Sequence, residues 1–412
     1  MNTTPSDQKA IQKIQEQAQK AGFDLAGAKI RRSSSRFCFG VEHGDYNGTE
    51  LFGVGTDRFI WLAYKPNQTG RVRLLSANFP EDGVVEFTPG SVPPPKSVRD
   101  SWSRFPFGVD YILQREGYSL STGFDAVIYG NIPGGGMSRS ASLALNLILT
   151  MLEVNGHSEE DGMRIVDLAQ AVENDYIGSP CGQLDQIMIF FARAGNGTHY
   201  NPTTRTIEYI PLGEQAPPFC IASLDTGTVR PGLEKSTYKI RRTECEQLVE
   251  ILHQAGFEIK NLAELKTEED LNRMLAIAEE KHPHLCQRGR YIFEAQKRFY
   301  AMLSAWREGD IETVGKIFRQ DGIGLRDQYC ISGPELESMC DISRTVPGVL
   351  GERMLGGGDK GAAGALLLED AADALRAAVE CAYPRSHPEF SDRYAVHICK
   401  TVDGITLLDK RL

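Results

Sequence analysis

A glycine-rich segment at residues 131–142 carries the residue types that hold a phosphate group. Its three consecutive glycines would let the backbone approach an anion and turn several N–H groups toward it. The apolar run before it (124–129) predicts a strand, and the run after it (141–151) predicts a buried helix whose N-terminus also favours an anion. The candidate phosphate-binding residues are Gly134, Gly135, Gly136, Ser138, Arg139, Ser140 and Ser142. The alternative is a glycine turn followed by a serine helix cap, because the P-loop pattern G-x-x-x-x-G-K-[ST] is absent.

A second segment, residues 36–48, groups charged and hydrogen-bonding side chains beside a Tyr-Asn-Gly turn. It contains Arg36, Glu42, His43 and Asp45. Such a set suits a polyhydroxylated ligand, because each hydroxyl needs donors and acceptors at fixed angles. The alternative is a solvated polar loop.

A third segment, residues 171–186, holds two carboxylates around a Gly/Pro turn. Glu173 stands near the end of one predicted helix and Asp185 near the start of the next. The two could face one site, with one binding a cation and the other acting on a hydroxyl proton. Asp185 could equally complement the dipole at a helix start.

Residues 356–364 formally contain G-x-G-x-x-G, the dinucleotide-binding pattern. That pattern signals a dinucleotide site only between a strand and a helix of a βαβ unit. Here it lies near the C-terminus before an apolar, strand-like run, so we reject a dinucleotide site.

Length, charge and cysteine usage restrict the class of protein. A chain of 412 residues predicts two domains, since single cores stop growing at roughly 250–300 residues. The net charge of −10 argues against binding nucleic acid or an anionic membrane. No apolar run is long enough to span a bilayer, and the polar N-terminus has no signal-peptide core. The nine dispersed cysteines, without a C-x-x-C pair, are typical of reduced thiols, so we expect a cytoplasmic protein.

Hydrophobic periodicity predicts an α+β fold in two lobes, which we place at residues 1–190 and 191–412. The region 23–39 is expected to form strands around a turn at Ser33, Ser34 and Ser35. Further strands are predicted at 52–64, 71–79, 365–368 and within 396–408. Helices are predicted at 8–22, 98–116, 161–177, 233–254, 267–281, 289–307 and 371–382.

Five separated motifs together resemble the galactokinase family of the GHMP small-molecule kinases, and the resemblance covers nearly the whole chain in order. Arg36 and residues 42–47 are similar to the family's arginine followed by Glu-His-Thr-Asp-Tyr-Asn. Residues 134–142 resemble its glycine and serine loop, residues 181–186 its Cys-Gly-Ile-Met-Asp-Gln segment, and residues 353–358 its Arg-Met-Thr-Gly-Gly-Gly. Tyr238 before Arg241 and Arg242 matches a tyrosine that precedes a basic pair.

The resemblance implies a two-lobed GHMP kinase fold and the ATP- and Mg²⁺-dependent phosphorylation of the anomeric hydroxyl of galactose. Asp185 would be the catalytic carboxylate, with Arg36 as the cation beside it. The implied sugar pocket consists of Glu42, His43, Asp45, Gly182 and Tyr238. Ser140 and Glu173 would hold Mg²⁺, and Trp102 would lie near adenine. Phosphoryl transfer needs mainly positioning and charge stabilisation, so such a set of residues suffices.

Several positions depart from the family pattern. Arg139 replaces a loop serine, Gly44 and Leu355 replace threonines, and Asp359-Lys360 replaces Phe-Gly. Two alternatives therefore stay open: a kinase for another sugar, such as arabinose, a heptose or an N-acetylhexosamine, and a ligand sensor without useful turnover. The intact Asp185, Arg36 and Glu173 favour an enzyme. We expect a small-molecule sugar and ATP as its partners, no nucleic acid and no membrane, and a monomer or weak homo-oligomer.

Overall fold

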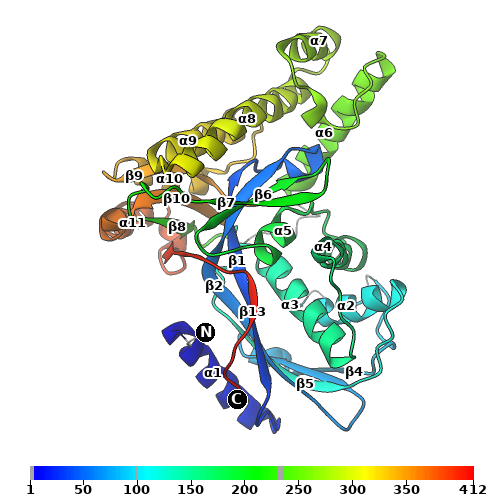
Figure 1. The fold of residues 1–412 in the computed structure, drawn as a ribbon. Coiled ribbons are helices and arrows are strands. Elements are labelled where there is room, and N and C mark those ends of the chain that lie inside the picture. Colours follow the sequence, from blue (N-terminus) through cyan, green and yellow to red (C-terminus); the bar gives the residue numbers. More distant parts are fainter. Residues whose placement is uncertain (1–3, 96, 99–100, 230–235) are drawn as a thin grey trace.

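The computed structural model describes residues 4–95, 97–98, 101–229 and 236–412, which form two β-sheets with helices packed on them (Figure 1). The nine-stranded sheet has the core order β13-β1-β2-β5-β3-β4; β6 and β12 also pair with β2, and β7 pairs with β6. Its strands are β1 (Lys29–Gly40), β2 (Leu51–Pro66), β3 (Val72–Ser76), β4 (Val84–Phe87), β5 (Phe124–Gly130), β6 (Asn196–Asn201), β7 (Thr206–Pro211), β12 (Thr401–Val402) and β13 (Ile405–Leu407).

The long strands β1 and β2 lie side by side in the large sheet. They pair antiparallel from Lys29 opposite Tyr64 to Gly40 opposite Phe52. The expected turn at Ser33–Ser35 is wrong, because all three serines lie inside β1 and are buried. Two of the hydroxyls find buried partners: Ser33 Oγ donates to the Ser142 carbonyl oxygen at 3.1 Å, and Ser35 Oγ donates to the Met137 carbonyl oxygen at 2.6 Å.

Helices cover both faces of the large sheet (Figure 1). One face carries α2 (Arg104–Arg115), α3 (Arg139–Val154), α4 (Gly162–Ala171) and α5 (Leu184–Phe190), with a π-helical turn at Val172–Ile177. The other face carries α1 (Pro5–Ala21), which begins at Thr4 in a capping box with Asp7. Asp7 is buried and accepts hydrogen bonds from Arg32 at 2.9 Å and from the Trp61 indole at 2.7 Å, so α1 is fixed to β1 and β2.

The second sheet has the order β11-β8-β10-β9 and packs against the C-terminal helices. Its strands are β8 (Phe219–Asp225), β9 (Val349–Met354), β10 (Ala362–Leu368) and β11 (Ala395–Cys399). The helices of this half are α6 (Thr237–Gln254), α7 (Glu268–Ala278), α8 (Pro283–Glu308), α9 (Ile311–Asp327), α10 (Pro334–Arg344) and α11 (Ala372–Ser386). The apolar side chains of β1 and β2 nearest the second sheet, such as Phe37 and Phe52, belong to its core, so the two sheets share packing.

The predicted α+β class is confirmed. The division at residue 190 stays a prediction; β6, β7, β12 and β13 come from beyond it yet extend the large sheet. Residues 356–361 connect the antiparallel strands β9 and β10, so the rejection of a βαβ dinucleotide site is confirmed. All nine cysteines are free thiols, and within the described ranges no helix is long and apolar enough to cross a membrane.

Candidate active site

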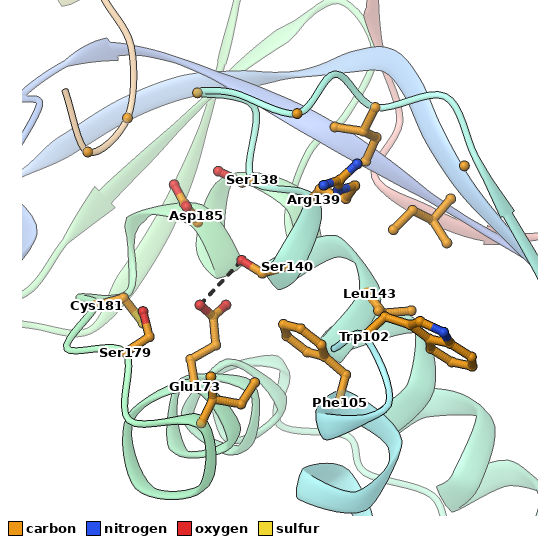
Figure 2. A pocket seen from close by; sticks show the side chains of 18 of the residues that line it. Trp102, Phe105, Ser138, Arg139, Ser140, Leu143, Glu173, Ser179, Cys181 and Asp185 are labelled. Atoms are coloured by element: carbon orange, nitrogen blue, oxygen red, sulfur yellow. Dashed lines mark hydrogen bonds between the residues drawn. The ribbon is translucent and has the colours of Figure 1, made fainter. Parts of the chain in front are cut away.

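A cavity of about 660 Å³ lies where the predicted motifs meet (Figure 2). Its wall includes residues from β1, from the loop before α3, from the π-helical turn, from the start of α5 and from the β9–β10 connection. The predicted residues among them are Arg36, Glu42, His43, Asp45, Trp102, Gly134, Gly136, Ser138, Arg139, Ser140, Glu173, Gly182, Asp185 and Tyr238. Segments far apart in the sequence therefore build one site.

Arg36 and Asp185 form an ion pair at this cavity. The Arg36 Nε and Nη2 atoms lie 2.7 and 2.6 Å from the same carboxylate oxygen, Oδ1 of Asp185. The Arg36 side chain is 2% exposed, whereas the Asp185 side chain is 33% exposed. Both guanidinium contacts fall on Oδ1, so Oδ2 of Asp185 remains available to a ligand in the cavity. Burial opposes the charge of Arg36, but the carboxylates of Asp185 and Glu42 raise its pKa.

The glycine loop lies between this ion pair and the start of α3. Arg36 Nη1 donates to the Gly136 carbonyl oxygen at 2.6 Å, so Arg36 also holds the loop. Gly136 has a φ of 69°, in the left-handed region. At Gly135 a Cβ atom would stand 2.5 Å from the Cα of Gly361, so only glycine allows the two loops to touch.

The loop serines differ in what they can bind. Ser138 is the N-cap of α3 but makes no capping bond, and its buried hydroxyl has no hydrogen-bond partner among the described residues. This disfavours the alternative of a simple serine cap and leaves an unsatisfied polar atom where a phosphate would bind. Ser142 lies outside the cavity wall: it is fully buried, and its hydroxyl bonds to Ser33 Oγ at 2.8 Å. We therefore remove Ser142 from the proposed phosphate site.

Ser140 and Glu173 form a pair of oxygen ligands in the cavity, joined by the dashed line in Figure 2. Ser140 Oγ donates to Glu173 Oε2 at 3.3 Å. Burial, and then the charge of Asp185, raise the pKa of Glu173 to about 8. The described residues contain no group of three or more His, Cys, Asp or Glu side chains that could enclose a metal ion. Mg²⁺ usually takes only one or two protein ligands beside water and phosphate oxygens, so this pair fits it.

The predicted sugar residues also converge. Glu42 is buried and pairs with Arg353, with 3.1 Å between Oε2 and Nη2. The Tyr238 ring packs against His43, with ring centroids 5.2 Å apart. Asp45 accepts a hydrogen bond from the Leu184 N–H at 3.3 Å, and burial raises its pKa to about 6. A Cβ atom at Gly182 would stand 1.9 Å from Oδ2 of Asp45, which explains the glycine.

The opposite end of the cavity is more apolar. Trp102, Phe105 and Leu143 lie together there, away from Asp185 and Glu173 (Figure 2). The Trp102 indole nitrogen is buried and has no hydrogen-bond partner in the described parts of the chain, so a planar ligand with an acceptor fits beside it.

Arg139 also lines the cavity. Its guanidinium lies 6.0 Å from the centre of the Phe79 ring, and no carboxylate of the described residues is within ion-pair distance. Burial lowers the pKa of Arg139, and the charge of Asp225 opposes this effect. The contact of Arg139 with a phosphate stays a prediction.

Sequence reasoning missed several residues of the wall. The segment 78–82, which follows β3, contributes Asn78, Phe79, Glu81 and Asp82. The predicted strand 71–79 includes the first two of these residues, nothing was predicted for the other two, and no motif marks any of them. Behind the wall, Arg353 was predicted only as the first residue of the motif at 353–358. No local sequence pattern indicates its contact with Glu42.

Comparisons with known proteins agree with the geometry. The model of the GHMP kinases N terminal domain matches residues 107–193. The galactokinase of Lacticaseibacillus casei is 33% identical over 79% of this chain and 82% of its own length. The galactokinase of Streptococcus mutans is 33% identical over 81% of this chain and 84% of its own length.

Among solved structures, Lactococcus lactis galactokinase complexed with galactose superposes with a TM-score of 0.86 at 27% identity, covering 95% of this chain and 98% of that one. Methanococcus jannaschii mevalonate kinase shares the fold, with a TM-score of 0.59 at 16% identity over 91% of this chain and 98% of that one.

Proposed function

Because this chain belongs to the galactokinase family of the GHMP kinases, we propose that it transfers the γ-phosphoryl group of ATP to the anomeric hydroxyl of galactose. The observation that supports this most is the Arg36–Asp185 ion pair, placed between the glycine loop and the predicted sugar residues. Relatives named galactokinase, and a neighbour complexed with galactose, favour this sugar over the other sugars considered.

Asp185 acts on the sugar hydroxyl. Its Oδ2 atom accepts the hydroxyl proton or a hydrogen bond from it, which turns the oxygen toward the phosphoryl group. Arg36 holds the carboxylate from the other side, through two contacts to Oδ1. Arg36 also offsets negative charge that develops between the two substrates.

The sugar and the nucleotide take opposite parts of the cavity. Glu42, His43, Asp45 and Tyr238, with the backbone at Gly182, give the sugar hydroxyls charged and neutral partners at fixed positions. The loop N–H groups at residues 134–136, the Ser138 hydroxyl and Arg139 bind the triphosphate. Trp102 packs beside the adenine ring.

Ser140 and Glu173 would hold Mg²⁺, which when bound neutralises charge on the phosphate oxygens. Their hydroxyl and carboxylate oxygens are the hard ligands this ion prefers. Without the ion, burial favours a protonated Glu173, so the carboxyl group is kept neutral until a cation is present.

A coupled assay of ADP release over a panel of free sugars tests the proposal. We expect turnover with galactose, a large preference over glucose, and little turnover with arabinose, a heptose or an N-acetylhexosamine. Asp185→Asn should lower kcat by about 10²–10⁴-fold, the usual contribution of a positioned acid or base. Calorimetry should show that this variant still binds galactose, since the isosteric amide keeps the pocket's shape.

Two results would overturn the proposal. Activity on another sugar only would reassign the substrate while keeping the kinase. Galactose and ATP binding without turnover by the parent protein would instead indicate a sensor.

A further inference from the structure

The carboxylate of Glu42 is held by a residue from the distant end of the chain. Arg353 lies on β9 and is 0% exposed in its side chain, while the Glu42 side chain is 4% exposed. Their Nη2 and Oε2 atoms are 3.1 Å apart. Because both side chains are almost fully buried, water competes little for this ion pair, although Oε2 of Glu42 has no hydrogen-bond partner among the described residues.

Arg353 is itself fixed on several sides. Its Nη2 atom also donates to the Cys38 carbonyl oxygen on β1 at 2.8 Å. Its guanidinium stacks over the Phe318 ring of α9, 4.5 Å from the ring centre. Asp321, one turn along α9, adds a negative charge nearby and is paired with Arg298 at 2.8 Å. These contacts hold the arginine through Nη2 and its ring stacking, while its buried Nε and Nη1 atoms have no hydrogen-bond partner in the described parts of the chain.

The backbone of Glu42 is held from the same half of the molecule. The Tyr291 hydroxyl on α8 donates to the Glu42 carbonyl oxygen at 3.0 Å, and Tyr291 is fully buried. Thus α8 fixes where the residue lies, while β9 fixes where its carboxylate points.

The charge of Glu42 depends on its surroundings. Burial raises the pKa of Glu42, while the guanidinium groups of Arg353 and Arg36 and a hydrogen bond from the Gly356 N–H oppose that rise. Asp185 adds to the rise. Without Arg353, Glu42 would take up a proton more readily and change from a pure acceptor into a donor.

We propose that Arg353 is a positioning residue for substrate recognition: it orients Glu42 as a hydrogen-bond acceptor for a sugar hydroxyl, and so sets galactose affinity without touching the sugar. The inference rests on the proposed role of Glu42 in sugar binding. Arg353 is not among the residues that line the cavity, so its effect must pass through Glu42.

The test is a double-mutant cycle on galactose binding, with Arg353→Met, Glu42→Gln and the double variant measured by calorimetry. Each single variant should bind galactose roughly ten- to a hundredfold more weakly, the loss expected for one hydrogen bond to a charged group. In the Glu42→Gln background, Arg353→Met should change galactose affinity little further. ADP affinity should stay within about twofold throughout, because the nucleotide end of the cavity does not contact Arg353.

Arg319→Met is the matched control. Arg319 on α9 pairs at 2.7 Å with the buried Glu352, the residue beside Arg353 on β9, and Glu352 also pairs with Arg344 at 2.8 Å. Alternation along the strand turns Glu352 away from Glu42. This variant also removes a guanidinium from a buried carboxylate, so it should lower stability yet leave galactose affinity unchanged.

Arg353→Met leaves Glu42 buried without its partner and is the variant at risk of not folding. Arg353→Lys keeps the charge but loses the planar fork, so this second variant tests the inference even if Arg353→Met does not fold. It should weaken galactose binding in the parent and have no effect in the Glu42→Gln background.

The outcomes separate the inference from the function it rests on. Unchanged galactose affinity in Glu42→Gln would remove Glu42 from the sugar pocket and the inference with it. A clear loss in Glu42→Gln, combined with effects of Arg353 that add fully or that equally weaken ADP binding, would leave the sugar pocket standing but reduce Arg353 to a structural residue.

Discussion

Replacing Gly182 with alanine should disrupt sugar binding through a single contact. The added Cβ atom would stand 1.9 Å from Oδ2 and 2.3 Å from Cγ of Asp45, so the carboxylate must rotate away. Asp45 then loses the hydrogen bond from the Leu184 N–H and its place in the pocket. The displaced carboxylate can no longer hydrogen-bond a sugar hydroxyl. Losing one such hydrogen bond to a charged group costs about 1.5–3 kcal/mol, which corresponds to a galactose KM raised roughly 10–150-fold. Strain from the added methyl group should lower the free energy of unfolding by about 1–3 kcal/mol.

The kinetic pattern distinguishes this mechanism from general damage. The three atoms nearest the new methyl group all belong to Asp45 and none to the Arg36–Asp185 pair, so kcat at saturating galactose should fall less than kcat/KM does. The control is the same substitution in an Asp45→Ala background, where the two closest atoms, Oδ2 and Cγ, are gone and only the Cβ atom at 2.9 Å remains. Steady-state assays should show that Gly182→Ala then adds little to the effect of Asp45→Ala. Equal galactose KM in Gly182→Ala and the parent, or fully additive effects, would refute the reasoning.

Three further predictions concern the metal, the nucleotide and pH. Glu173→Gln should strongly raise the Mg²⁺ concentration needed for half-maximal activity, because an amide lacks the charge that a hard dication requires; superimposable magnesium titrations would make Glu173 a structural residue. Arg139→Ser should weaken ATP and ADP binding by about 1–3 kcal/mol with little effect on galactose, and calorimetry showing equal or tighter ATP binding would make the arginine a bystander or an obstruction. With a pKa of about 6, Asp45 is ionised above that pH and takes up a proton below it, so kcat/KM for galactose should fall as the pH drops through 6. Asp45→Asn should remove this step from the pH profile, and an identical step in that variant would assign the titration to another group.

Local patterns predicted the parts of the site that are built from consecutive residues. The strand, glycine loop and helix around residues 124–151 correspond to β5, the loop and α3. The hydrophobic pattern of this segment matches the burial of its residues, so local pattern and tertiary packing favour the same structure. The Ser140–Glu173 and Arg36–Asp185 pairs came from matching known motifs rather than from local physics.

The residues that sequence reasoning missed depend on packing between distant elements. Helix α9 was not predicted, because Gly315, Gly322 and Gly324 lower its helix propensity. Those glycines serve tertiary contacts: a Cβ atom at Gly322 would stand 2.6 Å from the Cβ of Arg353. Close approach to β9 therefore overrides the local preference. No window of consecutive residues contains this information.

The positions where this chain departs from its family fall on different sides of the glycine loop. Leu355 is fully buried behind the loop, and a Cβ atom at Gly136 would stand 3.0 Å from the leucine Cβ. An apolar side chain there supports the loop without contacting a ligand. Arg139, in contrast, lines the cavity. Arg36 bonds both Asp185 and the Gly136 carbonyl oxygen, so the position of this pair depends on the loop backbone, against which Leu355 packs. Of these two departures, only Arg139 faces the cavity, where we propose that the nucleotide binds.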